Sequence, residues 1–129
     1  MIEKGIKGYA ETLVSADKCA DSMGSGELRV FSTPAMIALV EEAAWKSVAD
    51  ELDEGCGTVG TRVDIAHIGA TLPNKRVTCE TELCEVDGRK LTFTARVYDE
   101  KGKIGEGTHE RFIIFNEKFM DKLEKKFSE

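Results

Sequence analysis

The longest apolar run of the chain predicts a central helix. Residues 32–48 read STPAMIALVEEAAWKSV, in which two adjacent glutamates interrupt an otherwise apolar stretch ahead of Lys46. Thr33 suits the N-cap position and Pro34 the first helical position, and the helical pattern continues to about Leu52 before DEGCG ends it. Because the first three turns are apolar nearly all round, we expect a sheet to wrap this helix.

Alternation of apolar and polar residues predicts five strands around the helix. The expected strands are residues 5–14, 58–70, 75–86, 91–98 and 104–115. Asp87-Gly88 predicts a tight hairpin, and Gly105 and Gly107 indicate a bulge or a close backbone approach. Residues 17–30 are expected to cross irregularly, and Asn116 is expected to cap a short amphipathic tail helix.

One long helix followed by four consecutive antiparallel strands predicts an α+β fold. We expect the hot-dog architecture, in which a curved antiparallel sheet wraps around a long central helix and a short C-terminal helix follows. The length of 129 residues fits a single domain over residues 1–129.

Composition and charge narrow the class of protein. Eighteen basic and 24 acidic residues give a formal charge of −6, which argues against a nucleic-acid-binding protein. The start of the chain lacks the apolar run of a signal peptide, and no stretch approaches membrane-spanning length. The four cysteines show no regular spacing, so we expect reduced thiols in a cytoplasmic protein without membrane contact.

Helical spacing assigns the two adjacent glutamates to different environments. The helix neighbours of Glu41 at three, four and seven positions are apolar, whereas Glu42 precedes Lys46 by four positions. The Glu-before-Lys order favours a surface ion pair, so we expect Glu42 in solvent and Glu41 facing the apolar arc. A buried carboxylate needs donors or a function, although a glutamate at the edge of a helix face can also reach water.

Period-two alternation predicts a histidine on the side of strand 58–70 that faces the helix. The residues expected to share this face are Val59, Thr61, Val63, Ile65 and His67, with Gly60 on the more polar face. His67 is either a satisfied core residue or, together with Glu41, an acid–base pair. Thr33 stands two turns before Glu41 and is either a plain N-cap or a third member of that constellation.

The stretch GTHER, residues 107–111, places His109 and Arg111 on one strand face beside Gly107 and Gly105. An arginine among glycines suits an anionic or carbonyl-bearing ligand that approaches the backbone. The alternative is a solvated charge at the edge of the sheet. Two histidines without a cysteine or carboxylate cluster are poor material for zinc, so no metal site is expected.

Several short motifs, in order over residues 7–120, resemble the fluoroacetyl-CoA thioesterase-like family of hot-dog acyl-CoA thioesterases. The motifs are Phe31-Ser32-Thr33 followed by Glu41, Gly60-Thr61 followed by His67, Thr71-Leu72-Pro73, Asp87-Gly88-Arg89 and GTHER. GTHER is the most distinctive of them. The ordered set is more specific than any single motif.

The resemblance implies hydrolysis of an acyl-CoA thioester. Thr33, Glu41 and His67 would then be the catalytic residues, with Glu41 acting as general base or as nucleophile. The substrate-binding residues implied are Gly60, Arg111 and Phe31. The family forms homodimers whose sheets join edge to edge, with acyl-CoA bound between the subunits, and further pairing into tetramers stays open. No cofactor is implied, since CoA is part of the substrate.

The segment before the helix departs from the family pattern. It reads DSMGSGELRVFS, with Phe31 as its only aromatic residue, where the fluoroacetate-resistance enzyme carries an aromatic-rich lid. We therefore expect hydrolysis of a short- or medium-chain acyl-CoA rather than fluoroacetyl specificity. The candidates for the CoA phosphates are Lys75, Arg76, Arg89 and Lys90. The alternative function is binding of acyl-CoA or a small apolar ligand without turnover, and a hydratase is less favoured because no separate Asp/His dyad is present.

Overall fold

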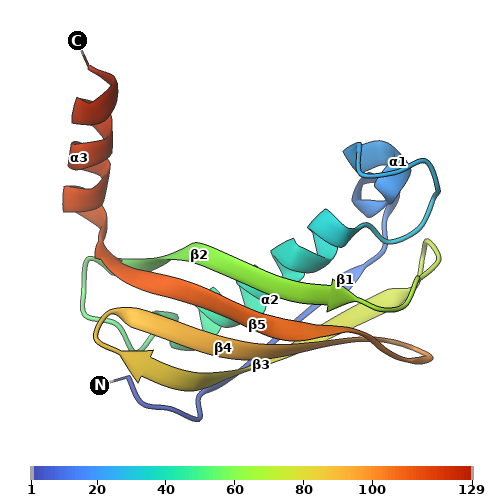
Figure 1. Cartoon of the computed structure of the whole chain (residues 1–129), viewed down its shortest axis with the longest axis horizontal. Coiled ribbons are helices and arrows are strands. Elements are labelled where there is room, and N and C mark those ends of the chain that lie inside the picture. Colours follow the sequence, from blue (N-terminus) through green and yellow to red (C-terminus); the bar gives the residue numbers. More distant parts are fainter. Residues whose placement is uncertain (1, 129) are drawn as a thin grey trace.

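Five antiparallel strands form one curved sheet in the order β1-β3-β4-β5-β2, as the computed structural model of residues 2–128 shows. The strands are β1 Lys7–Leu13, β2 Cys56–His67, β3 Arg76–Asp87, β4 Lys90–Asp99 and β5 Gly102–Phe115. The helix α2, Thr33–Ala49, lies along the concave face of this sheet (Figure 1). The arrangement is the predicted hot-dog fold, with β1 and β2 as the two edge strands.

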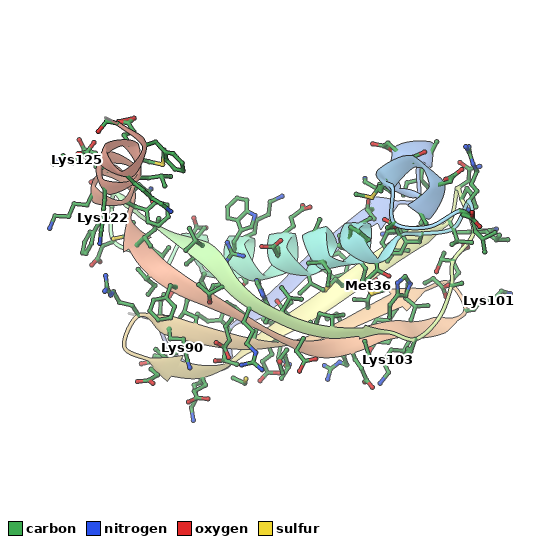
Figure 2. All side chains as sticks on the ribbon, turned by 45° about the horizontal axis from the view of Figure 1, so that its top comes forward. Met36, Lys90, Lys101, Lys103, Lys122 and Lys125 are labelled. Carbon is green, nitrogen blue, oxygen red and sulfur yellow. The ribbon has the colours of Figure 1, made fainter. Side chains whose placement is uncertain are left out.

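The concave face of the sheet and one side of α2 form the hydrophobic core, in which α2 packs mainly on β1 and β3. As the alternation predicted, the buried residues of β3 are Val77, Cys79, Thr81 and Leu83, and those of β4 are Leu91, Phe93, Ala95 and Val97. Met36 of α2 points toward the sheet (Figure 2) and is fully buried. A Cβ at Gly105 would lie 2.6 Å from its sulfur, so β5 makes the predicted close approach there.

The central helix begins one residue earlier at its cap and ends sooner than predicted. Ser32, not Thr33, is the N-cap, because its hydroxyl accepts a hydrogen bond from the Ala35 amide at 3.1 Å. Thr33 is the first helical residue, which leaves its side chain free of a capping role. The helix ends at Ala49 rather than Leu52, and the amides of the next residues bond back by three positions in turns.

A β-bulge in β2 corrects the predicted faces of this strand. The register with β5 shifts between Gly60 and Arg62, so Thr61 is an extra residue on β2. Because of this shift, Gly60 faces α2, with a Cβ position 2.7 Å from the Glu41 carboxylate, instead of lying on the opposite face. Thr61 bonds its hydroxyl to the Glu110 carbonyl. The predicted face was therefore wrong before the bulge: Val59 pairs with Phe112, which alternates with the inward-facing Arg111, and Thr61 has no register partner.

The remaining elements are short. The crossing segment is not wholly irregular, since it contains a 3₁₀ turn at Ala16–Lys18 (η1) and the helix α1 at Ala20–Met23. The tail helix α3 spans Asn116–Phe127, with Phe115 rather than Asn116 at the N-cap position, and projects away from the sheet (Figure 1). Within residues 2–128, no helix is both long and apolar enough to cross a membrane.

Candidate active site

The N-terminus of α2 and the C-terminal end of β2 bring Thr33 and His67 together. Oγ1 of Thr33 lies 2.8 Å from Nδ1 of His67. The buried Phe31 ring meets the imidazole edge-on, with ring centroids 6.3 Å apart and an interplanar angle of 70°. An open cavity of about 310 Å³ adjoins this group, and its lining includes Ala20, Ser25, Val30, Ile68 and Ala70.

Backbone hydrogen bonds fix the loop that follows His67. The amides of Ile68 and Gly69 both donate to the Ile104 carbonyl, at 2.7 and 3.1 Å. The Thr71 carbonyl accepts from the Phe31 amide at 2.9 Å, which ties this loop to the segment that carries the Phe31 ring. These contacts place Phe31 and His67 on a supported backbone rather than on a free loop.

The His67 ring is set up to exchange a proton. Burial lowers its pKa, while the Gly69 backbone partly opposes that shift, so the neutral ring is favoured at pH 7. Its Nε2 is buried and has no hydrogen-bond partner among the described residues. A buried polar atom without a partner is uncommon, and here it belongs to a residue that lines the adjoining cavity.

Glu41 lies in a second cluster, two helical turns along α2. Its Oε2 is 3.4 Å from Nη1 of Arg111, and Gly60 packs directly against the carboxylate. A second open cavity, of about 480 Å³, is lined by Glu41, Arg111, Trp45 and their neighbours. The prediction that Glu41 is interior was wrong for this chain, because its side chain is 41% exposed and that of Glu42 is 43% exposed.

The two glutamates differ in their partners rather than in their burial. Glu42 forms the predicted ion pair with Lys46 at 2.7 Å. The partner of Glu41 is a buried arginine, since Arg111 is only 6% exposed. The alternative that Arg111 is a solvated edge charge is therefore excluded.

Arg111 is held by several acceptors at once. Its Nε donates to Oγ1 of Thr58 at 2.8 Å, and its Nη2 donates to the Thr58 carbonyl at 3.1 Å. Its Nη1 lies between Glu41 and Nε2 of His109, at 3.1 Å from the histidine. Burial lowers the pKa of Arg111, and the nearby Glu41 carboxylate opposes that shift. Each of the three guanidinium nitrogens of Arg111 therefore has a partner within the protein.

The expected contact between Glu41 and His67 is not a feature of the single chain. Among residues 2–128, the polar partner of His67 is Thr33 and that of Glu41 is Arg111. Thr33 and Glu41 are eight residues apart on one helix, which corresponds to about 12 Å at 1.5 Å per residue. The candidate site thus consists of two clusters, one at each end of this interval along α2.

No role was predicted for Thr58 or His109 from the sequence, although both belong to the Glu41 cluster. His109 carried a usable signal, because it shares the face of β5 with Arg111. For Thr58 the bulge hid the signal, since the unbroken alternation placed it on the wrong face. Among residues 2–128, no group of three or more histidine, cysteine, aspartate or glutamate residues is arranged to hold a metal ion.

The four basic residues expected to bind CoA phosphates do not form one patch. Lys75 and Arg76 lie at the start of β3, whereas Arg89 and Lys90 lie in the hairpin that follows its end. β3 has 12 residues, so these pairs are separated by most of the length of the sheet. Arg76 is also paired with Glu11 on the β1 edge. Within one chain the two pairs therefore lie far apart.

Comparison with known proteins identifies relatives over most of the chain. A family model described as fluoroacetyl-CoA-specific thioesterase (FlK) matches residues 14–117. The fluoroacetyl-CoA thioesterase of Streptantibioticus cattleyicolor is 40% identical over 97 residues, which are 75% of this chain and 70% of the relative. A solved structure of the fluoroacetyl-CoA thioesterase FlK has a TM-score of 0.91 at 33% identity, with 99% of both chains covered. A hot-dog-like protein from Thermanaerovibrio acidaminovorans shares the fold at 18% identity, with a TM-score of 0.90 over 99% and 95% of the two chains.

Proposed function

The chain belongs to the fluoroacetyl-CoA-specific thioesterase family and is an acyl-CoA thioesterase, and from that premise we propose that it hydrolyses short- or medium-chain acyl-CoA to the free acid and CoA with Thr33, Glu41 and His67. The observation that carries the proposal is the Thr33–His67 hydrogen bond beside a cavity, with Nε2 of His67 left unpartnered. A neutral imidazole held by one nitrogen can accept or donate a proton through the other.

In the proposed reaction, the Glu41 carboxylate either attacks the thioester carbon or removes a proton from the water that does so. His67 exchanges a proton with the departing thiolate or with water, and the Thr33 hydroxyl orients the imidazole. Attack by Glu41 would leave an anhydride that water then hydrolyses. A single turnover in H₂¹⁸O tests for the anhydride route, because ¹⁸O enters the Glu41 carboxylate only if water attacks an anhydride at the glutamyl carbon.

The bulge of β2 supports a role for Gly60 in stabilising negative charge on the thioester oxygen. It leaves one residue, Thr61, out of the register with β5, and a backbone N–H at this position would be available to a ligand if it is unpaired. Such an N–H is a suitable oxyanion donor next to the Glu41 carboxylate. Phe31 would border the acyl group from the side of His67.

We propose a homodimer joined along β2, with acyl-CoA bound between the subunits. β2 is a 12-residue edge strand, and a long open edge favours pairing with another strand. The side of α2 next to it exposes Ala38 and Trp45, the latter 44% exposed. Sedimentation of the wild type and of Trp45→Asp tests this arrangement, and a monomeric wild type at micromolar concentration would contradict it.

The substrate class is tested with a panel of acyl-CoA esters of increasing chain length that includes fluoroacetyl-CoA. Release of CoA is followed with a thiol reagent, and a blank without substrate is needed because Cys84 is exposed. We expect turnover of short and medium acyl chains without a preference for the fluorinated ester, because Phe31 is the only aromatic residue in residues 21–32, before the central helix. Hydrolysis confined to fluoroacetyl-CoA would overturn this assignment.

A further inference from the structure

His109 is a fully buried titratable group that the proposed reaction does not use. It is 0% exposed and stacks on Phe93, with ring centroids 6.2 Å apart. Its Nδ1 lies 2.8 Å from the carbonyl oxygen of Arg62, and its Nε2 lies 3.1 Å from Nη1 of Arg111. Both ring nitrogens therefore have partners inside the protein.

The chemistry of these two partners fixes the protonation of the ring. A carbonyl oxygen can only accept, so the proton must be on Nδ1. A guanidinium can only donate, so Nε2 must present its lone pair to Arg111. The ring is thus neutral and in a single tautomer. The charged groups that act on it are Arg111, which opposes a second proton, and Glu41 and Glu110, which favour one.

The contact with His109 helps to place Nη1 of the Arg111 guanidinium next to Glu41. Nη1 of Arg111 is shared between His109 and Glu41, at 3.1 and 3.4 Å. A charged imidazolium would present an N–H to this nitrogen and repel the guanidinium. Loss of the acceptor would therefore remove the closer of the two partners of Nη1, while Thr58 still holds Nε and Nη2.

We propose that His109 is a positioning residue, which acts as a neutral acceptor from the Nδ1–H tautomer and holds Arg111 against Glu41. The catalytic consequence of this arrangement rests on the proposed role of Glu41, whereas the tautomer does not. The two parts are therefore tested by separate measurements.

The tautomer is read from ¹⁵N NMR of the histidine rings at pH 7. The chain has only two histidines, so the His67→Gln variant leaves the signals of His109 alone. We expect a neutral ring with the proton on Nδ1. A ring protonated on Nε2, or on both nitrogens, overturns the proposal. The measurement needs no activity, so it stands even if Glu41 proves to have no catalytic role.

The catalytic consequence is tested with His109→Gln, which keeps a neutral acceptor, and His109→Leu, which removes it. We expect His109→Leu to lower kcat by about 10- to 100-fold with KM little changed, because a buried donor loses its partner, and His109→Gln to recover most of kcat. Equal kcat for both variants, or a loss in KM alone, overturns the proposal.

A double-mutant cycle tests whether His109 acts through Arg111. The double variant Arg111→Lys/His109→Leu should have nearly the same kcat as Arg111→Lys alone, because Arg111→Lys already breaks the chain of contacts. A full additional loss of kcat would overturn action through Arg111. If His109→Leu fails to fold, His109→Ala, which also removes the acceptor, is measured in the wild-type and Arg111→Lys backgrounds instead.

Discussion

Thr33 Oγ1 and His67 Nδ1 are joined by a 2.8 Å hydrogen bond, although the residues are 34 positions apart in the chain. One of them is the first residue of a helix and the other is the last residue of an edge strand. Because Ser32 caps the helix, the Thr33 hydroxyl is not needed as a cap at the helix terminus. Its partner is the His67 ring alone.

Thr33→Val should therefore lower turnover without lowering stability much. The substitution removes the hydroxyl that orients His67, and we expect kcat to fall about tenfold or more, while Thr33→Ser keeps most of it. Acyl-CoA hydrolysis and urea denaturation of each variant measure the two effects. The matched control is Ser32→Ala, which should cost about 1 kcal/mol in the free energy of unfolding through loss of the cap. A larger loss of stability in Thr33→Val than in Ser32→Ala would argue against this division of roles.

Glu41 and Glu42 offer a matched pair of substitutions, since their side chains are exposed to nearly the same extent. Glu41→Gln should lower kcat about 100-fold or more, in the range that general acid–base catalysis contributes. Glu42→Gln removes only a surface ion pair with Lys46 and should leave kcat within about twofold. The measurement is steady-state hydrolysis of one acyl-CoA by both variants. Similar kcat values for the two variants would refute a catalytic role for Glu41.

Gly60 is predicted to be intolerant of a side chain for a local reason. A Cβ there would lie 2.7 Å from Oε2 of Glu41 and 3.2 Å from Nη1 of Arg111. Gly60→Ala should displace the carboxylate and lower kcat by about tenfold or more, because small displacements of reacting groups are costly. Gly26→Ala is the control, since its Cβ would meet only Ala20 at 3.4 Å. Unchanged kcat in Gly60→Ala would show that the Glu41 position is not critical.

The sequence predicted the fold well where alternation was unbroken. β3 and β4 bury the residues that a period of two assigns to one face, because neither contains an early bulge that reverses the core positions. It failed in β2, where the extra residue Thr61 reverses the faces on one side of the bulge. The bulge depends on how β2 pairs with β5, so no local pattern in the sequence of β2 indicated it.

The sequence singled out several residues of the candidate site, but it predicted few of the contacts between them. Spacing on the helix identified Glu41 and Glu42 as different, and the structure confirms different partners but not different burial. The Glu41–Arg111 contact joins residues 70 positions apart, and only the folded sheet brings them together. The choice of Ser32 over Thr33 as N-cap depends on one backbone conformation, which the sequence leaves open because both residue types cap well.

Folding stability should depend on pH through the two histidines. Burial lowers the pKa of His67 and of His109 in the folded chain, whereas in the unfolded chain both titrate near the ordinary value of about 6.5. Between the two pKa values the unfolded chain binds more protons, so their contribution is complete above pH 6.5 and is lost as the pH falls toward the folded pKa. We expect the urea midpoint to be nearly constant from pH 8 to 7 and to fall below about pH 6.5.

His109→Gln separates the contribution of this residue from that of the carboxylates, which also titrate in acid. The variant has no titrating group at position 109, so its urea midpoint should fall less steeply between about pH 6.5 and 5 than that of the wild type. Urea denaturation at half-unit pH steps measures both slopes. Parallel slopes for the two proteins would mean that His109 takes up no proton on unfolding. That outcome would contradict a neutral His109 held between the Arg62 carbonyl and Arg111 in the folded chain.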